Sequence, residues 1–119
     1  MAQYKLARAA TDKAEGLYAN NGADKGGETY KGVARNFHPS WIGWKYVDMA
    51  KNELAYPPVD REFRQQWVAK LNAKLEQIPA LQTAIDEFYR SQFWDANKLT
   101  SVANQAVANW IYDHAVNAG

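Results

Sequence analysis

The sequence of 119 residues contains no cysteine and only two histidines. Without cysteine, the chain cannot form disulfide bonds, use a cysteine nucleophile or bind a metal through thiolates. The two histidines, His38 and His114, lie far apart and no close acidic cluster joins them, so we expect no zinc site. We expect His114 to be a packed or hydrogen-bonded side chain rather than a metal ligand.

The chain also lacks a long apolar run and a strong net charge. No stretch approaches the roughly 18 apolar residues of a membrane span. The segment from Met1 to Tyr18 has no continuous apolar region of the kind found in secretory signal peptides. We therefore expect no integral membrane segment, and synthesis in the cytoplasm without a signal peptide. The net charge of +1 is too small to predict binding to nucleic acid or to an anionic membrane.

The composition fits a single folded domain, which we place at residues 1–119. Hydrophobic residues make up 47% and charged residues 23%, which is ordinary for a globular protein. Aromatic residues reach 13%, with five tryptophans and seven tyrosines. These rings could build the core, which composition favours, or form a platform on which a sugar or a base stacks.

Hydrophobic periodicity predicts a mainly α-helical fold of about five helices. The predicted helices are residues 3–19, about 41–52, a third from the cap Asp60 to a break at Pro79, about 80–93 and about 102–118. We predict Ser40, Asp60 and Ser101 as N-caps. The last helix has the widest apolar surface, so we expect it to be the central and most buried one. Residues 20–38 carry turn signals, which predict a small turn-rich lobe with a hairpin after the first helix.

The stretch from Glu15 to Val33 is where we expect any chemistry, and it holds five of the seven glycines. Glu15 falls near the end of the first predicted helix, where the helix dipole and nearby aromatic rings would raise the pKa of its carboxyl group. Asp24 lies in a turn and should stay ionised. Two carboxyl groups of different acidity are the working pair of most glycosidases, and Thr29 could orient a water molecule or hold Asp24. The alternatives are a solvated glutamate on a helix and an ordinary turn.

Residues 22–29 also come close to a phosphate-binding loop, and we reject that interpretation. The sequence Gly22-Ala-Asp-Lys-Gly-Gly-Glu-Thr29 nearly fits the pattern G-x-x-x-x-G-K-[ST]. Glu28 stands where that loop requires lysine, so the charge facing a phosphate would be reversed.

Two motifs in this stretch resemble glycoside hydrolase family 108, whose members are N-acetylmuramidases also described as secretion-activating proteins. The motifs are Glu15-Gly16-Leu17-Tyr18 and then Asp24-Lys-Gly-Gly-Glu-Thr29 followed by Gly32-Val33. Phe93-Trp94-Asp95 and Ala115–Gly119 are similar to later segments of that family. The family's motif has glycine where this chain has Leu17. Family members usually continue through a peptidoglycan-binding segment, and we expect most of that segment to be absent here.

The resemblance implies a lysozyme-like fold and hydrolysis of the β-1,4 bond between N-acetylmuramic acid and N-acetylglucosamine. It implies Glu15 as the catalytic acid and no cofactor. The spacing also looks like the E-x8-D-x5-T arrangement of phage-type lysozymes, which Glu15 and Asp24 fit. Thr29 comes one position early, and Tyr30 occupies the expected place.

The predicted partner is the glycan strand of peptidoglycan. The residues that we predict to bind it are Tyr18, Tyr30, Trp41, Trp44, Tyr46 and Asn117. The enzyme would reach the cell wall, in the periplasm or outside the cell, through a holin or a dedicated secretion machine. One alternative is a non-catalytic peptidoglycan-binding or secretion-accessory protein on the same fold. Another is a helical module that docks a protein partner.

Overall fold

The computed structural model describes residues 1–11, 17–20, 25–54 and 60–118. Within these residues the chain forms two compact units. One combines Met1–Glu15 with Asp86–Gly119, and the other is Gly16–Ile85. The helix α4 (Pro79–Tyr89) contributes its first part to the second unit and its last part to the first.

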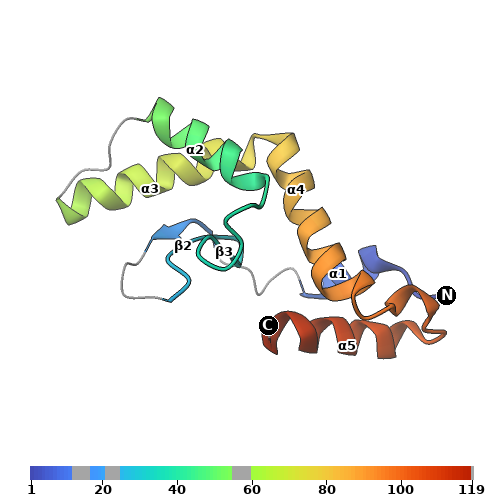
Figure 1. Cartoon of the computed structure of the whole chain (residues 1–119). Helices are drawn as coiled ribbons and strands as arrows, with labels where there is room; N and C mark the ends of the chain where they lie inside the picture. Colours follow the sequence, from blue (N-terminus) through green and yellow to red (C-terminus); the bar gives the residue numbers. More distant parts are fainter. Residues whose placement is uncertain (12–16, 21–24, 55–59, 119) are drawn as a thin grey trace. The chain divides into compact units, whose positions relative to one another are not determined.

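The unit Gly16–Ile85 contains a small antiparallel sheet of order β1-β2-β3 (Figure 1). Its strands are β1 (Ala19–Asn20), β2 (Glu28–Tyr30) and β3 (Val33–Ala34). A two-residue loop joins β2 to β3, and both of its residues have positive φ, 44° at Lys31 and 83° at Gly32. This is the backbone of a type I′ turn, whose twist matches that of the flanking strands.

The same unit contains two helices, α2 (Gly43–Glu53) and α3 (Arg61–Glu76). They pack directly against each other (Figure 1). Apolar side chains spaced three or four residues apart give each helix one buried face. The buried core of the unit includes Trp44, Val47, Leu71, Leu75 and Leu81.

The other unit is built on α1 (Tyr4–Thr11) and α5 (Gln105–Ala118), which pack together. Its core is aromatic. The rings of Tyr4, Trp94 and Tyr112 meet edge to face, with centroids 5.7–6.2 Å apart. Trp94 lies in a π-helical segment, Arg90–Asp95, that continues α4, and a short 3-10 turn, Leu99–Ser101, follows.

The predicted fold class is confirmed. Five α-helices and one three-stranded sheet, placed after the first helix, account for most of the described residues. The break at Pro79 is confirmed too, since Pro79 is the first residue of α4. Proline suits that position because its missing N–H has no partner there. The fourth helix is shorter than predicted, because the α-helical pattern changes to a π-helix after Tyr89.

One of the three predicted N-caps is confirmed. The Asp60 carboxylate accepts a hydrogen bond of 2.9 Å from the Glu62 N–H. Ser40 is not a cap, because α2 begins only at Gly43 and Ile42 precedes it. Ser101 is not a cap either. The Asn104 side chain caps α5 by accepting a hydrogen bond of 3.1 Å from the Val107 N–H.

The prediction that the last helix is the most buried one is wrong. In α5 only Ala108 and Tyr112 are buried among the side chains that the structure describes, whereas Trp110 is 68% exposed and Val107 48% exposed. His114 stacks on the Trp110 ring with centroids 5.4 Å apart. The apolar surface of α5 is wide, but α1 and the aromatic core cover only one stripe of it.

Among the described residues, no helix is both long enough and apolar enough to cross a membrane. The same residues contain no group of three or more His, Asp or Glu side chains placed to hold a metal ion.

Candidate functional site

Strand β2 carries the predicted threonine, and its two faces differ sharply. Side chains alternate along a strand, so Glu28 and Tyr30 share one face and Thr29 points to the other. Glu28 and Tyr30 are buried, while Thr29 is half-buried. Tyr30 is fully buried, at 0% exposure. Thr29 and Tyr30 therefore cannot line the same surface, and only the Thr29 side chain keeps contact with solvent.

The face that carries Thr29 is flanked by small side chains. Thr29 pairs with Ala19 on β1 and with Ala34 on β3, and directly paired residues of an antiparallel sheet point to the same face. The threonine side chain therefore has a small methyl side chain on each side of it.

Gly26 and Gly27 fit where larger residues would not. A Cβ on Gly26 would lie 2.9 Å from the Ala34 Cβ, and a Cβ on Gly27 would lie 2.7 Å from the Asn36 Nδ2. Gly27 also has a φ of +69°, which favours glycine. The two glycines therefore let the chain approach β3 closely just before Thr29.

We expect Gly27→Ala to lower the free energy of unfolding by about 2 kcal/mol, because a left-handed conformation costs an L-residue roughly 1–2 kcal/mol and the Asn36 amide must also move. Urea unfolding followed by tryptophan fluorescence measures this loss. Adding Asn36→Ala should recover the steric part but not the backbone part. A Gly27→Ala variant as stable as the wild type would contradict the conformation described here.

Glu28 is the centre of a buried network of charges on the other face of the sheet. Its side chain is 9% exposed. One carboxylate oxygen accepts hydrogen bonds of 2.6 Å from the Tyr18 hydroxyl and 2.6 Å from the Lys51 Nζ. The other oxygen accepts one of 2.8 Å from Arg35. Both oxygens are thus bound, and by donors from three separate segments.

The network continues through Arg35. Its guanidinium donates two hydrogen bonds of 2.7 Å to the Asp48 carboxylate and lies 5.1 Å from the centre of the Trp44 ring. The Arg35 N–H also donates to the Glu28 carbonyl at 2.8 Å. Paired, two-point hydrogen bonds of this kind fix orientation as well as distance.

These contacts set the acidity of the groups. Burial raises the pKa of Glu28, but the hydrogen bonds from Lys51, Tyr18 and Arg35 outweigh it, so the pKa of Glu28 is lowered. The hydrogen bonds from Arg35 lower the pKa of Asp48. Burial, with the hydrogen bond to Glu28, raises the pKa of Tyr18. Glu28 is therefore ionised at neutral pH and cannot act as a proton donor there.

The lowered pKa values predict how stability depends on pH. A carboxyl group whose pKa is lower in the folded state stabilises the protein above its unfolded pKa, about 4.3 for glutamate and 3.9 for aspartate. This stabilisation is lost as the pH falls through the folded pKa values. We expect the free energy of unfolding to decrease below about pH 4.5, and to decrease less steeply in Glu28→Gln. Urea titrations between pH 7 and pH 3 test this, and identical slopes for the two proteins would contradict it.

The predicted acids Glu15 and Asp24 lie outside the described residues, so their catalytic roles stay predictions. Leu17, which stands in the place of a motif glycine, is 52% exposed. Three of the predicted sugar-binding rings belong to the core instead of the surface: Tyr18, Tyr30 and Trp44.

The other predicted binding residues keep some exposure. Trp41 is half-buried, meets the Trp44 ring at 5.3 Å and donates a hydrogen bond to the Ala84 carbonyl. Asn117 is exposed in the other unit, where its amide donates to the Asp113 carbonyl at 2.8 Å. Within its unit, the structure therefore brings Trp41 and Trp44 together.

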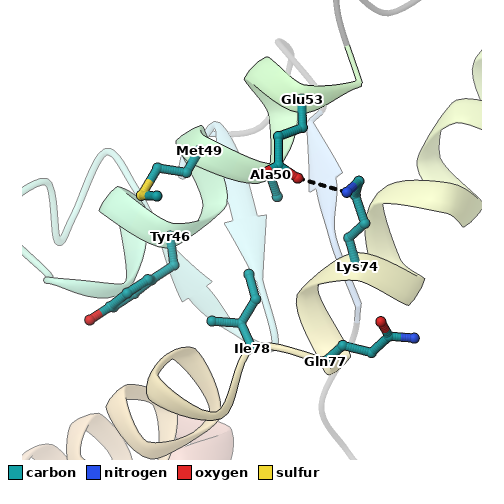
Figure 2. Close-up of a pocket in the computed structure, with 7 residues that line it drawn as sticks. All are labelled: Tyr46, Met49, Ala50, Glu53, Lys74, Gln77 and Ile78. Atoms are coloured by element: carbon teal, nitrogen blue, oxygen red, sulfur yellow. Dashed lines mark hydrogen bonds and ion pairs between the residues drawn. The ribbon is translucent and has the colours of Figure 1, made fainter.

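Tyr46 lines a groove of about 340 Å³ between α2 and the C-terminal end of α3. Figure 2 shows the side chains that line it: Tyr46, Met49, Ala50 and Glu53 from α2, Lys74 from the last turn of α3, and Gln77 and Ile78 just after that helix. Glu53 and Lys74 form an ion pair of 2.7 Å at its edge. The groove thus offers one aromatic ring, apolar side chains and both donors and acceptors of hydrogen bonds.

Sequence reasoning missed the Glu28 network. In the sequence patterns, Glu28 stands at a variable position of the family motif and breaks a phosphate-loop pattern, and no pattern includes Arg35 or Lys51. One signal was available. In a strand, Glu28 must share a face with Tyr30, so a buried tyrosine implies a buried glutamate that needs partners.

Comparison with protein families places the chain among the glycoside hydrolases. The model of the family described as Glycosyl hydrolase 108 matches residues 8–119, so the chain belongs to glycosyl hydrolase family 108. The resemblance found in the sequence motifs is thereby confirmed, and the family implies a carbohydrate substrate. No curated protein and no solved structure matches the chain.

Proposed function

We propose that this protein is a peptidoglycan hydrolase of the N-acetylmuramidase type, which cleaves the β-1,4 bond between N-acetylmuramic acid and N-acetylglucosamine. The family match over residues 8–119 carries the proposal, because it spans both acidic motifs. Glu15 protonates the glycosidic oxygen as general acid. Asp24 activates water or stabilises the positive charge that develops on the sugar ring, and the distance between the two carboxyl groups decides between inversion and retention.

Two observations on the described residues support the proposal. Glu28, the acid next to Thr29 in the sequence, is ionised and surrounded by donors, so it does not compete for the role of general acid. The Thr29 hydroxyl lies on the more open face of β2, flanked by Ala19 and Ala34, where it could orient a water molecule or hold Asp24. Tyr30, at the position that phage-type lysozymes reserve for threonine, is buried.

We also propose that the groove beside Tyr46 contributes to saccharide binding. A tyrosine ring next to an amide and an ion pair can stack on a sugar ring and bind its hydroxyl groups. Trp41 is the other ring of the predicted set that stays half-exposed. The partner is the glycan strand of peptidoglycan. The site of action is the cell wall, reached through a holin or a dedicated export machine.

Tyr46→Ala should weaken saccharide binding. We expect KM for soluble peptidoglycan fragments to rise about tenfold, since one stacked ring is worth roughly 0.5–1.5 kcal/mol beyond its buried area, with kcat changed less. Phe63→Ala is the matched control, because Phe63 is an exposed ring, 56% exposed, that does not line this groove. Equal effects of the two substitutions would remove the groove from the binding site.

A product analysis tests the proposed reaction. Purified peptidoglycan is incubated with the protein, the new reducing ends are reduced with borohydride, and the fragments are identified by mass. We expect fragments that end in reduced N-acetylmuramic acid. Fragments that end in reduced N-acetylglucosamine would show cleavage of the other glycosidic bond and would overturn the muramidase assignment.

A second candidate is a non-catalytic peptidoglycan-binding or secretion-accessory protein. Leu17 favours it, because its exposed side chain adds apolar bulk where the family motif has glycine, two residues after Glu15. This candidate predicts binding to insoluble peptidoglycan in a sedimentation assay without any release of reducing ends.

A further inference from the structure

We infer that Glu28 is a positioning residue for the proposed reaction: its carboxylate fixes the motif residue Tyr18 and strand β2, and with β2 the Thr29 hydroxyl, against helix α2. The inference rests on the proposed function and adds to it a residue that touches no substrate.

The geometry makes the carboxylate a common attachment point. The donors to Glu28 come from three places: Tyr18 just before β1, Arg35 just after β3, and Lys51 in α2. Glu28 itself belongs to β2. The Glu28 side chain therefore connects the residue before β1, strand β2, the residue after β3 and helix α2.

Three parts of Tyr18 make contacts that fix its position: the hydroxyl, the backbone N–H and the ring. Its hydroxyl donates to Glu28, its N–H donates to the Asn72 side chain at 3.0 Å, and its ring meets the Trp67 ring edge to face at 6.3 Å. Tyr18 is the last residue of the motif that begins at Glu15, so these contacts hold the end of that motif in place.

Thr29 is coupled to Glu28 through the backbone. The two residues are adjacent in β2, and their side chains point to opposite faces. Any rotation or slide of the strand that loosens Glu28 from its donors also displaces the threonine hydroxyl. The hydrogen bond from the Arg35 N–H to the Glu28 carbonyl ties the same residue to the chain after β3.

Stability alone does not require a charged centre here. Replacing a buried ion pair with apolar side chains of similar volume is often neutral or stabilising. What charged hydrogen bonds supply beyond stability is direction, since they fix distances and angles. This network holds Tyr18 of the motif and strand β2, which carries Thr29. Fixed distances and angles at these residues matter for the proposed catalysis.

The test compares steady-state kinetics of Glu28→Gln and Tyr18→Phe with the wild type, at a temperature at which circular dichroism shows each variant folded. We expect kcat to fall about 10- to 100-fold, because small misplacements of reacting groups can cost a factor of 10². KM should change less than about threefold. The double variant should be no slower than Glu28→Gln, because both substitutions break the same network.

Two further variants separate positioning from loss of stability. Thr100→Val removes the hydrogen bond to the buried Trp94 indole in the other unit, so it should destabilise the protein without lowering kcat. A triple variant combines Tyr18→Phe, Glu28→Leu and Lys51→Met, which replaces Glu28 and two of its donors with apolar side chains and leaves the Arg35–Asp48 pair. We expect this triple variant to fold and still to lose kcat.

The outcomes separate the inference from the proposed function. Suppose that the wild type cleaves peptidoglycan and that the folded Glu28→Gln and triple variants have the same kcat as the wild type. This result would overturn the inference and leave the proposed function standing. An equal loss of kcat in Thr100→Val would also overturn it, by showing that destabilisation is the cause. A wild type that releases no saccharide would overturn the proposed function, and the inference with it.

Discussion

Glu28→Ala is expected to lower the free energy of unfolding by about 3 kcal/mol, the lower end of the range measured when one partner of a buried ion pair is removed. The loss arises because the Lys51 ammonium and the Tyr18 hydroxyl are left without their acceptor. It stays at the lower end for two reasons. Lys51 and Arg35 keep some exposure, 27% and 33% of their side chains, and Arg35 keeps both hydrogen bonds to Asp48. Urea unfolding followed by tryptophan fluorescence measures the change.

Glu53→Ala is the matched control for this prediction. It also removes a glutamate that pairs with a lysine at 2.7 Å, but the Glu53 side chain is 63% exposed. An exposed pair contributes at most about 1 kcal/mol, so Glu53→Ala should change stability by less than that. Similar losses in the two variants would show that burial of the Glu28 network has little energetic consequence.

The sequence predicted the helical architecture well, because local signals determine it. Pro79 separates α3 from α4, and Asp60 caps α3, through interactions with residues close in the chain. The burial of α5 was mispredicted because periodicity reports how wide an apolar surface is. It does not report how much of that surface other elements cover, and Trp110 lies on the uncovered part.

The site was predictable only in part, for a similar reason. The two motifs that contain Glu15, Asp24 and Thr29 predicted the family, and the match over residues 8–119 confirms it. The partners of Glu28 lie 7, 10 and 23 residues away in the sequence, and no local pattern joins them. An aromatic residue can likewise stack on a sugar or fill a core, and only tertiary packing distinguishes the buried Tyr30 from the half-exposed Tyr46.

Glu15→Gln is expected to lower kcat/KM on peptidoglycan by a factor of about 10² to 10⁴, the usual contribution of a general acid. The amide keeps the size and most hydrogen bonds of the acid but has no proton to give to the leaving oxygen. The activity of the wild type should also decrease as the pH rises through the pKa of the acid, because only the protonated form donates. The residual activity of the variant should lack that decrease on the alkaline side.

The control for this variant is Glu62→Gln, the same substitution at an exposed acid in the first turn of α3. It should leave kcat/KM within about twofold, because Glu62 lies in a different segment from both motifs and surface substitutions usually have small effects. A folded Glu15→Gln variant with the activity and pH profile of the wild type would assign the acid role to another carboxyl group. That group could not be Glu28, since the donors around it hold it ionised, so Asp24→Asn would be the next variant to compare. If Asp24→Asn abolishes the alkaline decrease while Glu15→Gln keeps it, the two carboxyl groups exchange the roles proposed here.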